Sequence, residues 1–188
     1  MGGRVYPPEN RSYTTGIMPL MAEQMDVYAE SEARGWDSGS QETAMDNEGI
    51  DMAVMFPSRG LFSLGSDEIE PDLATAICRA YNDWLADFCS GSNRMFGAGM
   101  IPPHDVEGAV QEARRAVNEL GFKTVFMRPN PGHGRNWQDP YYDPLWAEIQ
   151  RLKVPISFHE GGLVDLPQPG DNFGTHMLYH TCTHSMSM

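Results

Sequence analysis

The chain has 188 residues, of which 40% are hydrophobic and four are Trp, and its formal net charge at pH 7 is −13. The apolar fraction excludes a disordered chain, and the length suffices for one domain with a substantial core. The acidic balance excludes a nucleic-acid partner and an anionic membrane surface, because both need a basic face. No run approaches the roughly 20 apolar residues of a membrane-spanning helix.

The first residues and the cysteines indicate the compartment. The start, MGGRVYPPENRSY, has no basic segment followed by an apolar one, so we expect no signal peptide. The number of cysteines is odd and no two are closely spaced, which is typical of reduced thiols; they are Cys78, Cys89 and Cys182. We therefore expect a cytoplasmic protein.

Two regions are expected along the chain. Residues 1–37 are predicted to form an irregular N-terminal excursion, because Pro7, Gly16 and Pro19 interrupt any long element. Residues 38–188 are predicted to form one domain of consecutive strand–helix units.

Four apolar runs bounded by Gly or Pro predict strands that are buried on both faces. These strands are Asp51–Phe56, Phe96–Ile101, Lys123–Arg128 and Val154–His159. Around them, apolar residues at spacings of three and four predict helices. These helices are Gln41–Glu48, Pro71–Cys89, Asp105–Leu120 and Asp143–Leu152, with a further candidate at His176–Met188. We expect Gly49 and Gly121 to end helices in the left-handed conformation, and Asp105 and Asp143 to cap them.

This alternation predicts a parallel sheet with helices outside it, and two closures fit. A doubly wound sheet would be complete at this length, whereas a (β/α)8 TIM-type barrel needs about 250 residues and eight strands. No strand is followed by G-x-G-x-x-G or a P-loop. Instead, three strands end in the turns FPSR, RPNP and HEG, and the carboxyl ends of barrel strands are where catalytic groups lie. These turns favour an α/β fold that is a partial barrel.

His159 and Glu160 follow the fourth predicted strand. If the face that carries His159 points into the barrel, the imidazole lies at its mouth and is a candidate metal ligand. The alternative is a His that bonds a nearby carbonyl. Glu160 is a candidate ligand or general base, or else it caps the following turn.

Arg128 and Asn130 follow the third predicted strand. A guanidinium at the barrel mouth can hold a substrate carboxylate through two hydrogen bonds. Alternatively, Arg128 pairs with a loop acid such as Asp139 or Asp143. Asn130 can line the same pocket, or it can serve turn formation.

His176, His180 and His184 stand at four-residue intervals near the end of the chain. On a helix they share one stripe, but eight residues rise about 12 Å, so all three cannot bind one ion. One pair can bind a metal, or His180 or His184 can contact substrate. A frayed terminal segment is the alternative.

Whole phrases of the sequence resemble the amidohydrolase-related family, in the branch of the aminocarboxymuconate-semialdehyde decarboxylase-like enzymes. These phrases are DNEGIDMAVMFPSRGLF, AICRAYNDWLADFCS, MIPPHDVEGAVQEARRAVNELGFKTVFMRPNP, GRNWQDPYYDPLWAEIQRLKVPISFHEG and HTCTH. The resemblance implies a (β/α)8 barrel with a divalent metal, usually Zn²⁺. It further implies hydrolysis or decarboxylation of a small carboxylate-bearing substrate.

The resemblance also implies roles for individual residues. His159 matches the metal-ligand His at the end of the family's fifth strand, and Arg128 matches a site-facing position at the end of the fourth. His180 and His184 match a His-bearing segment after the fifth strand, where we expect a catalytic and a substrate-binding role. The family's His-x-His pair has no counterpart, because no His precedes His104.

The four predicted strands therefore match the second to fifth of the family barrel. One hypothesis is a segment of a metal-dependent enzyme. Another is a truncated, non-catalytic homologue that binds a small acid or associates with other chains through open barrel edges, as a homo-oligomer or by self-association. A third is a complete doubly wound binding domain.

Metal content and sedimentation of the purified chain separate the first two hypotheses. Stoichiometric Zn²⁺ in a monomer would contradict the non-catalytic homologue. A metal-free chain that self-associates would contradict the chain being an enzyme by itself, since catalytic Zn²⁺ needs about three protein ligands.

Overall fold

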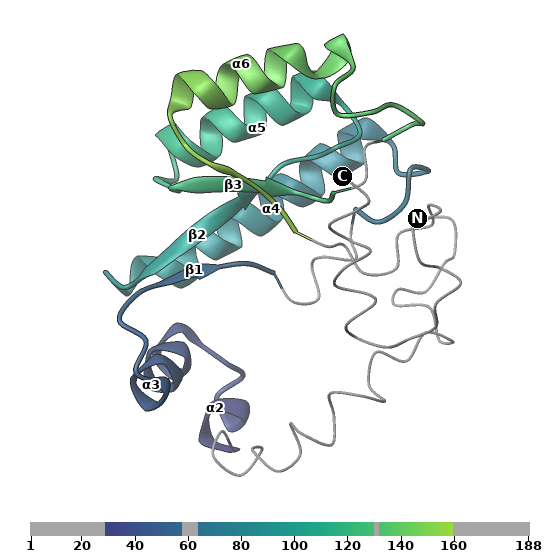
Figure 1. Cartoon of the computed structure of the whole chain (residues 1–188). Helices are drawn as coiled ribbons and strands as arrows, with labels where there is room; N and C mark the ends of the chain where they lie inside the picture. The colour runs from purple at the N-terminus through teal and green to yellow at the C-terminus, as the bar shows by residue number, and fades with distance from the viewer. Residues whose placement is uncertain (1–28, 58–63, 130–131, 160–188) are drawn as a thin grey trace, which may run out of the picture.

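The computed structural model describes residues 29–57, 64–129 and 132–159, in which strands and helices alternate (Figure 1). None of the helices in these ranges is long and apolar enough to cross a bilayer. The predicted helix His176–Met188 lies outside the described residues. Of the segment predicted to be irregular, residues 29–37 are described and include the five-residue helix α2, Ala29–Ala33.

The four predicted strands form one parallel sheet in the order β1-β2-β3-β4. Their bounds are Ala53–Met55 for β1, Met95–Met100 for β2, Thr124–Met127 for β3 and Ile156–Phe158 for β4. A doubly wound sheet reverses its strand order at a switch point, and no reversal occurs among these strands. The consecutive order in a curled sheet confirms the prediction of a partial (β/α)8 barrel (Figure 1).

The predicted helices are present with small changes at their ends. They are α3 at Ser38–Glu48, α4 at Pro71–Ser90, α5 at Val106–Asn118 and α6 at Asp143–Leu152, with the 3-10 helix η3 at Pro140–Tyr142. Gly49 and Gly121 adopt the predicted left-handed φ, at 68° and 75°. Asp105 caps α5 as predicted, and its carboxylate accepts a 2.6 Å hydrogen bond from the N–H of Gly108.

One capping prediction is wrong. Asp143 is the first residue of α6 rather than its cap, because η3 runs directly into the helix and gives Asp143 a helical φ of −53°. Tyr142 occupies the cap position, but its side chain makes no capping hydrogen bond to the helix. The acid that caps this region is Asp139, which accepts a hydrogen bond from the N–H of Tyr141 at the start of η3.

Two hydrophobic clusters cover opposite faces of β3, because alternate strand residues point in opposite directions. Val125 and Met127 belong to the cluster formed with α5 and α6. Phe126 belongs to the other cluster, which includes Ala98 and Met100 of β2 and the first half of α4. The alternation therefore places the residue after β3, Arg128, on the side of Phe126.

Glycines in β2 allow close packing of the helix layer. A Cβ atom at Gly97 would lie 2.5 Å from the ring of Phe122, and one at Gly99 would lie 2.8 Å from the Cβ of Ala116 in α5. Such distances are too short for real carbon contacts. The bare backbone of β2 is therefore what lets α5 and Phe122 lie directly on the sheet.

The carboxyl end of β2 is held by a side chain instead of a strand. The N–H of Ala53 donates to the carbonyl of Arg94. The backbone N–H and carbonyl groups of every second residue of β2, as far as Met100, therefore point toward β1. Pairing with β1 ends at Met55, and Pro57 has no N–H to continue it. The buried amide of Asn82 takes over, because its Nδ2 donates to the carbonyl of Met100 at 2.9 Å and its Oδ1 accepts from the Met100 N–H at 2.7 Å.

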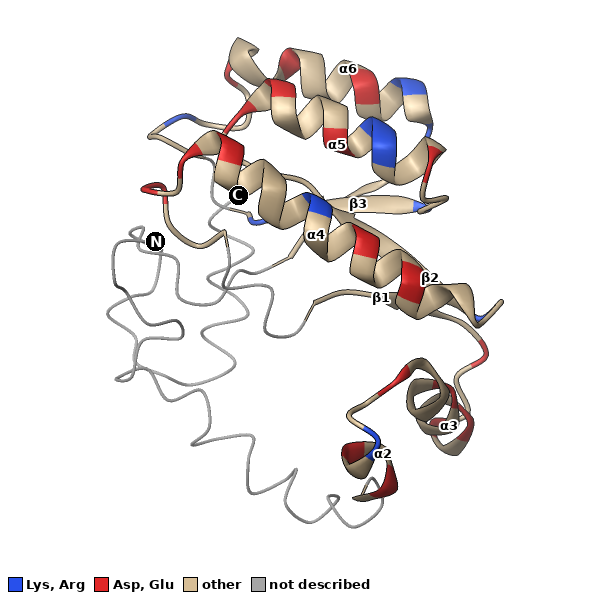
Figure 2. Cartoon of the chain, turned by 180° about the vertical axis from the view of Figure 1, so that it is seen from behind, with Lys and Arg blue, Asp and Glu red and all other residues tan. Residues whose placement is uncertain are grey.

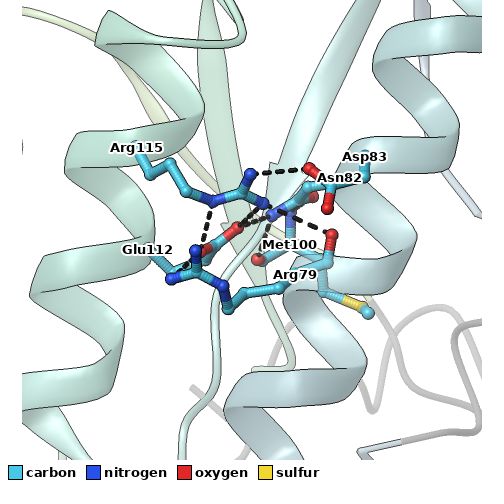
Figure 3. Close-up of polar contacts among 6 residues, drawn as sticks. All are labelled: Arg79, Asn82, Asp83, Met100, Glu112 and Arg115. Carbon is cyan, nitrogen blue, oxygen red and sulfur yellow. Dashed lines mark hydrogen bonds and ion pairs between the residues drawn. The ribbon is translucent and has the colours of Figure 1, made fainter.

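Asn82 is itself held by a buried acid (Figure 3). Its Nδ2 also donates to Glu112 of α5 at 2.7 Å, and Glu112 is completely buried. Arg115 donates to both carboxylate oxygens of Glu112, at 2.8 and 2.9 Å, and to Asp83 at 2.6 Å. Charge-assisted bonds of this kind compensate the desolvation of the acid, and here they join α4, α5 and the end of β2.

The exchange Asn82→Ala is expected to lower the free energy of unfolding by about 2–4 kcal/mol, because it leaves the buried N–H and carbonyl of Met100 without partners and removes one donor from the buried Glu112. Urea denaturation measures this change. The matched control is Asn93→Ala at an exposed position, for which we expect a change within about 0.5 kcal/mol. Equal effects of the two exchanges would show that the Asn82 amide does not hold β2.

Candidate functional site at the carboxyl ends of the strands

The parallel sheet brings four side chains together where its strands end. Phe56 follows β1, His104 follows β2, Arg128 follows β3 and His159 follows β4. Because neighbouring parallel strands end at the same edge, residues distant in the sequence meet there. Two of these four, Arg128 and His159, are residues that the sequence singled out.

His159 lies against an aromatic surface at this edge. Its N–H donates to the carbonyl of Met127 at 2.9 Å, which continues the ladder between β3 and β4 by one residue. Its ring centroid lies 5.2 Å from that of Phe56 and 6.3 Å from that of Phe126. The imidazole therefore lies on the same face as Phe126, as strand alternation predicts, in a partly apolar setting that fixes its ring.

Arg128 is buried and bonded to the segment that follows β1. Its side chain is 3% exposed, and its Nη2 pairs with the carboxylate of Asp67 while its Nη1 donates to the carbonyl of Leu64 at 2.8 Å. The pairing acid is thus Asp67 and not Asp139 or Asp143, the acids that the sequence suggested. This pair, with a bond from the N–H of His133, holds the pKa of the Asp67 carboxyl below its usual value although burial acts to raise it.

His104 is a buried imidazole that bonds the segment before α4. The residue is 3% exposed, and its Nε2 lies 2.8 Å from the carbonyl of Ser66. A carbonyl only accepts, so the proton of the neutral ring is on Nε2 and Nδ1 is an acceptor. Nδ1 is buried and has no hydrogen-bond partner among the described residues. Burial, with a smaller contribution from the charge of Arg128, lowers the pKa of His104 below 6.5, so the ring is neutral at pH 7.

These contacts anchor residues 64–70, which we call the strap. Ser66 binds His104 after β2, and Asp67 binds Arg128 after β3 and the N–H of His133 at 2.8 Å. The loop of His133 lies close to this cluster because Gly132 has no side chain, and a Cβ atom there would lie 3.0 Å from the carbonyl of Pro103. The strap thus connects the ends of β2 and β3 to the start of α4.

The described residues do not fit a metal centre by themselves. In residues 29–57, 64–129 and 132–159 no three His, Cys, Asp or Glu side chains are placed so that they can hold an ion. His159 is a single candidate donor, and a catalytic metal needs about three. The geometry here supports anion binding by Arg128 and hydrogen-bond acceptance by Nδ1 of His104.

Four of the predicted site residues cannot be placed. Glu160, Asn130, His180 and His184 lie outside the described residues, so their roles stay predictions. Conversely, sequence reasoning missed Asp67 and His104. Their only signal was position, since His104 comes four residues after β2 and Asp67 lies between β1 and α4, and both segments meet at the strand ends.

Comparison with known proteins agrees with this fold. Residues 8–188 match the family model described as Amidohydrolase. The gamma-resorcylate decarboxylase of Rhizobium radiobacter is 31% identical over 125 residues, which are 61% of this chain and 36% of that protein.

Two solved structures are also similar. A 2,6-dihydroxybenzoate decarboxylase complexed with 2,6-dihydroxybenzoate superposes with a TM-score of 0.59 at 27% identity, covering 71% of this chain and 41% of that one. A dihydroxybenzoic acid decarboxylase from Polaromonas sp. JS666, with bound manganese and the inhibitor 2-nitroresorcinol, has a TM-score of 0.58 at 25% identity, covering 71% and 40%. The chain thus spans about 36–41% of the length of these proteins.

The low pKa of His104 predicts a pH dependence. A folded pKa below the unfolded value of 6.5 means that the unfolded chain takes up the proton first. The stability contributed by neutral His104 is therefore complete above pH 6.5 and is lost as the pH falls through the folded pKa. In His104→Gln, whose amide still donates to Ser66, we expect this loss to be absent when thermal unfolding is followed from pH 7.5 to 5.

The control for this prediction is Asn93→Ala. Asn93 is exposed and precedes β2, at the opposite end of the strand from His104. This variant should keep the acid dependence of the parent chain. An unchanged acid dependence in His104→Gln would contradict a buried neutral imidazole at this position.

Proposed function

Since the chain belongs to the amidohydrolase family, we propose that it is a segment of a metal-dependent decarboxylase of small aromatic carboxylates. The relatives named above are decarboxylases, and two of them are named for dihydroxybenzoate acids. We favour decarboxylation over hydrolysis for this reason, and a hydroxylated benzoate as the substrate class.

The observation that best supports this proposal is that Arg128 binds a carboxylate within the chain, that of Asp67. Its guanidinium is buried at the carboxyl end of β3 and pairs with Asp67. A site that accommodates an internal carboxylate beside a buried guanidinium has the charge and the donors to bind the carboxylate of a ligand. In a chain with a net charge of −13, such a cation is needed to offset the general repulsion of an anionic substrate.

His159 is proposed as the residue that faces the reacting end of the substrate. Its ring lies against Phe56 and Phe126, which offer an apolar surface to an aromatic ring. We retain its proposed role as a metal ligand. The solved relative contains manganese, and zinc remains a prediction from the family resemblance. The described residues do not complete a metal site, so we derive no catalytic step through the ion.

The alternative of a non-catalytic association module rests on exposed apolar side chains. Met52, which precedes β1, and Val54 of β1 are 64% and 49% exposed, and Trp84 of α4 is 56% exposed. Among the described strands β1 pairs only with β2, so its other edge is a candidate for pairing with another chain. An association module would sediment as an oligomer and bind dihydroxybenzoate without consuming it.

The test is consumption of 2,6-dihydroxybenzoate by the purified chain with added Mn²⁺, followed by chromatographic detection of resorcinol. Arg128→Lys keeps the charge but loses the forked donor geometry, so we expect apparent affinity for the acid to fall about 10–100-fold. His159→Asn is expected to abolish Mn²⁺-dependent turnover and weaken Mn²⁺ binding measured by calorimetry. His133→Asn serves as the control and should match the parent chain.

Three outcomes would contradict the proposed function. They are acid binding without turnover, turnover that is independent of added metal, and Mn²⁺ binding that survives His159→Asn unchanged. The first outcome, with an oligomer in sedimentation, would favour the association module.

A further inference from the structure

The strap, residues 64–70, covers the buried guanidinium of Arg128 at the strand ends. Arg128 uses its Nη1 for Leu64 and its Nη2 for Asp67, both in the strap. The side chain of Asp67 is 21% exposed and that of Arg128 is 3% exposed, so the acid lies on the solvent side of the cation. A ligand that approaches from solvent meets the strap before it meets Arg128.

Asp67 presents to Arg128 the same chemical group that a carboxylic acid ligand would present. Each guanidinium has a limited number of donors in a fixed plane, so two carboxylates cannot take the same donor with good geometry. A carboxylate that binds Arg128 through Nη2 therefore has to replace Asp67. On release, the Asp67 carboxylate moves from the guanidinium to water, which solvates it at little cost because it is already partly exposed.

We propose that Asp67 is an internal competitor that occupies the carboxylate site of Arg128 until a ligand carboxylate displaces it, and that the strap moves with it. Asp67 is thus a positioning residue. It keeps the guanidinium neutralised and aimed at the strand ends in the empty state. Because a ligand has to displace Asp67, its net affinity for Arg128 is the difference between the binding free energies of the two carboxylates. Anions that bind Arg128 weakly are therefore disfavoured.

Few hydrogen bonds join the strap to the strand ends besides the pair of Asp67 and Arg128. The Ser66 carbonyl lies 2.8 Å from Nε2 of His104, the Leu64 carbonyl accepts from Arg128, and Asp67 accepts from the N–H of His133. Leu64 and Ile69 anchor the strap in the hydrophobic cluster of Phe126, so the part that exchanges lies between them. His104 has in addition the buried acceptor Nδ1, which has no partner among the described residues. A phenolic hydroxyl next to the ligand carboxylate is a donor of the kind that Nδ1 lacks, which matches a hydroxylated benzoate better than benzoate itself.

The test compares binding of 2,6-dihydroxybenzoate and benzoate to the parent chain and to Asp67→Asn by calorimetry. This inference rests on the proposed function for its ligand class. Asp67→Asn keeps the shape of the strap but removes the competing charge, so we expect both acids to bind about tenfold more tightly. Glu68→Gln is the matched control, since it removes one charge from an exposed position of the same segment and should leave affinity unchanged.

Hydrogen exchange of the parent chain gives a second measurement that does not depend on the stability of a variant. Saturating 2,6-dihydroxybenzoate should increase amide exchange within residues 64–70 as the strap leaves Arg128. Unchanged or decreased exchange there, or equal or weaker binding in Asp67→Asn, would overturn the internal competitor. Equal tightening in Glu68→Gln would also overturn it, because the effect would then be general electrostatics.

Turnover separates this inference from the proposed function. Tighter binding in Asp67→Asn together with increased exchange in residues 64–70 supports the strap even if the chain consumes no dihydroxybenzoate, and in that case only the decarboxylase proposal fails. Turnover by the parent chain without any gain in affinity in Asp67→Asn would overturn the internal-competitor proposal and leave the decarboxylase proposal standing. Absence of binding to both chains overturns both proposals.

Discussion

The arrangement of this chain depends on how the backbone of Met100 is satisfied at the end of β2. In the described part of the chain, no strand beyond Met55 pairs with the side of β2 that faces β1. Asn82 of α4 replaces the missing strand by bonding both the N–H and the carbonyl of Met100. A buried backbone group without a partner would cost free energy comparable to a lost hydrogen bond, so this amide decides where β2 can end.

Several other features follow from that contact. Because Asn82 is bonded to Glu112, the positions of α4 and α5 are coupled to the end of the strand. The chain then runs through Pro102 and Pro103, which are buried, to His104. The imidazole reaches Ser66 because the helix that contains Asn82 starts directly after the strap. A structural hydrogen bond on the helix side of the sheet thus positions groups at the candidate site.

Electrostatics makes Arg128 unusual in this molecule. Acidic positions predominate on the helix surface, as in α4, which carries Asp72, Asp83 and Asp87 against Arg79 (Figure 2). Arg151 and Arg114, whose side chains are largely exposed, pair with Glu148 between α5 and α6 and lower the pKa of that acid to about 2. Arg128 instead has its charge inside the fold and pairs with the partly exposed Asp67. A cation in that setting favours anions at this edge of an otherwise acidic protein.

The sequence by itself determined the elements and their order. Apolar runs between Gly and Pro identified all four strands, and helical periodicity with Gly49, Asp105 and Gly121 placed most helix ends, because these signals act over a few residues. It also placed Arg128 and His159 at strand ends. The wrong cap at Asp143 arose because a 3-10 turn and the following helix share their local signals.

The tertiary structure alone decided the partners. Nothing near Arg128 in the sequence indicates Asp67, which is 61 residues away, and nothing near Asn82 indicates Glu112 or Met100. The consecutive strand order decided between the two closures of the sheet. The acid that pairs with Arg128 and the burial of the His104 imidazole both depend on groups from different strand–helix units. These groups meet only when the sheet forms, because burial and hydrogen bonding are properties of the assembled strand ends.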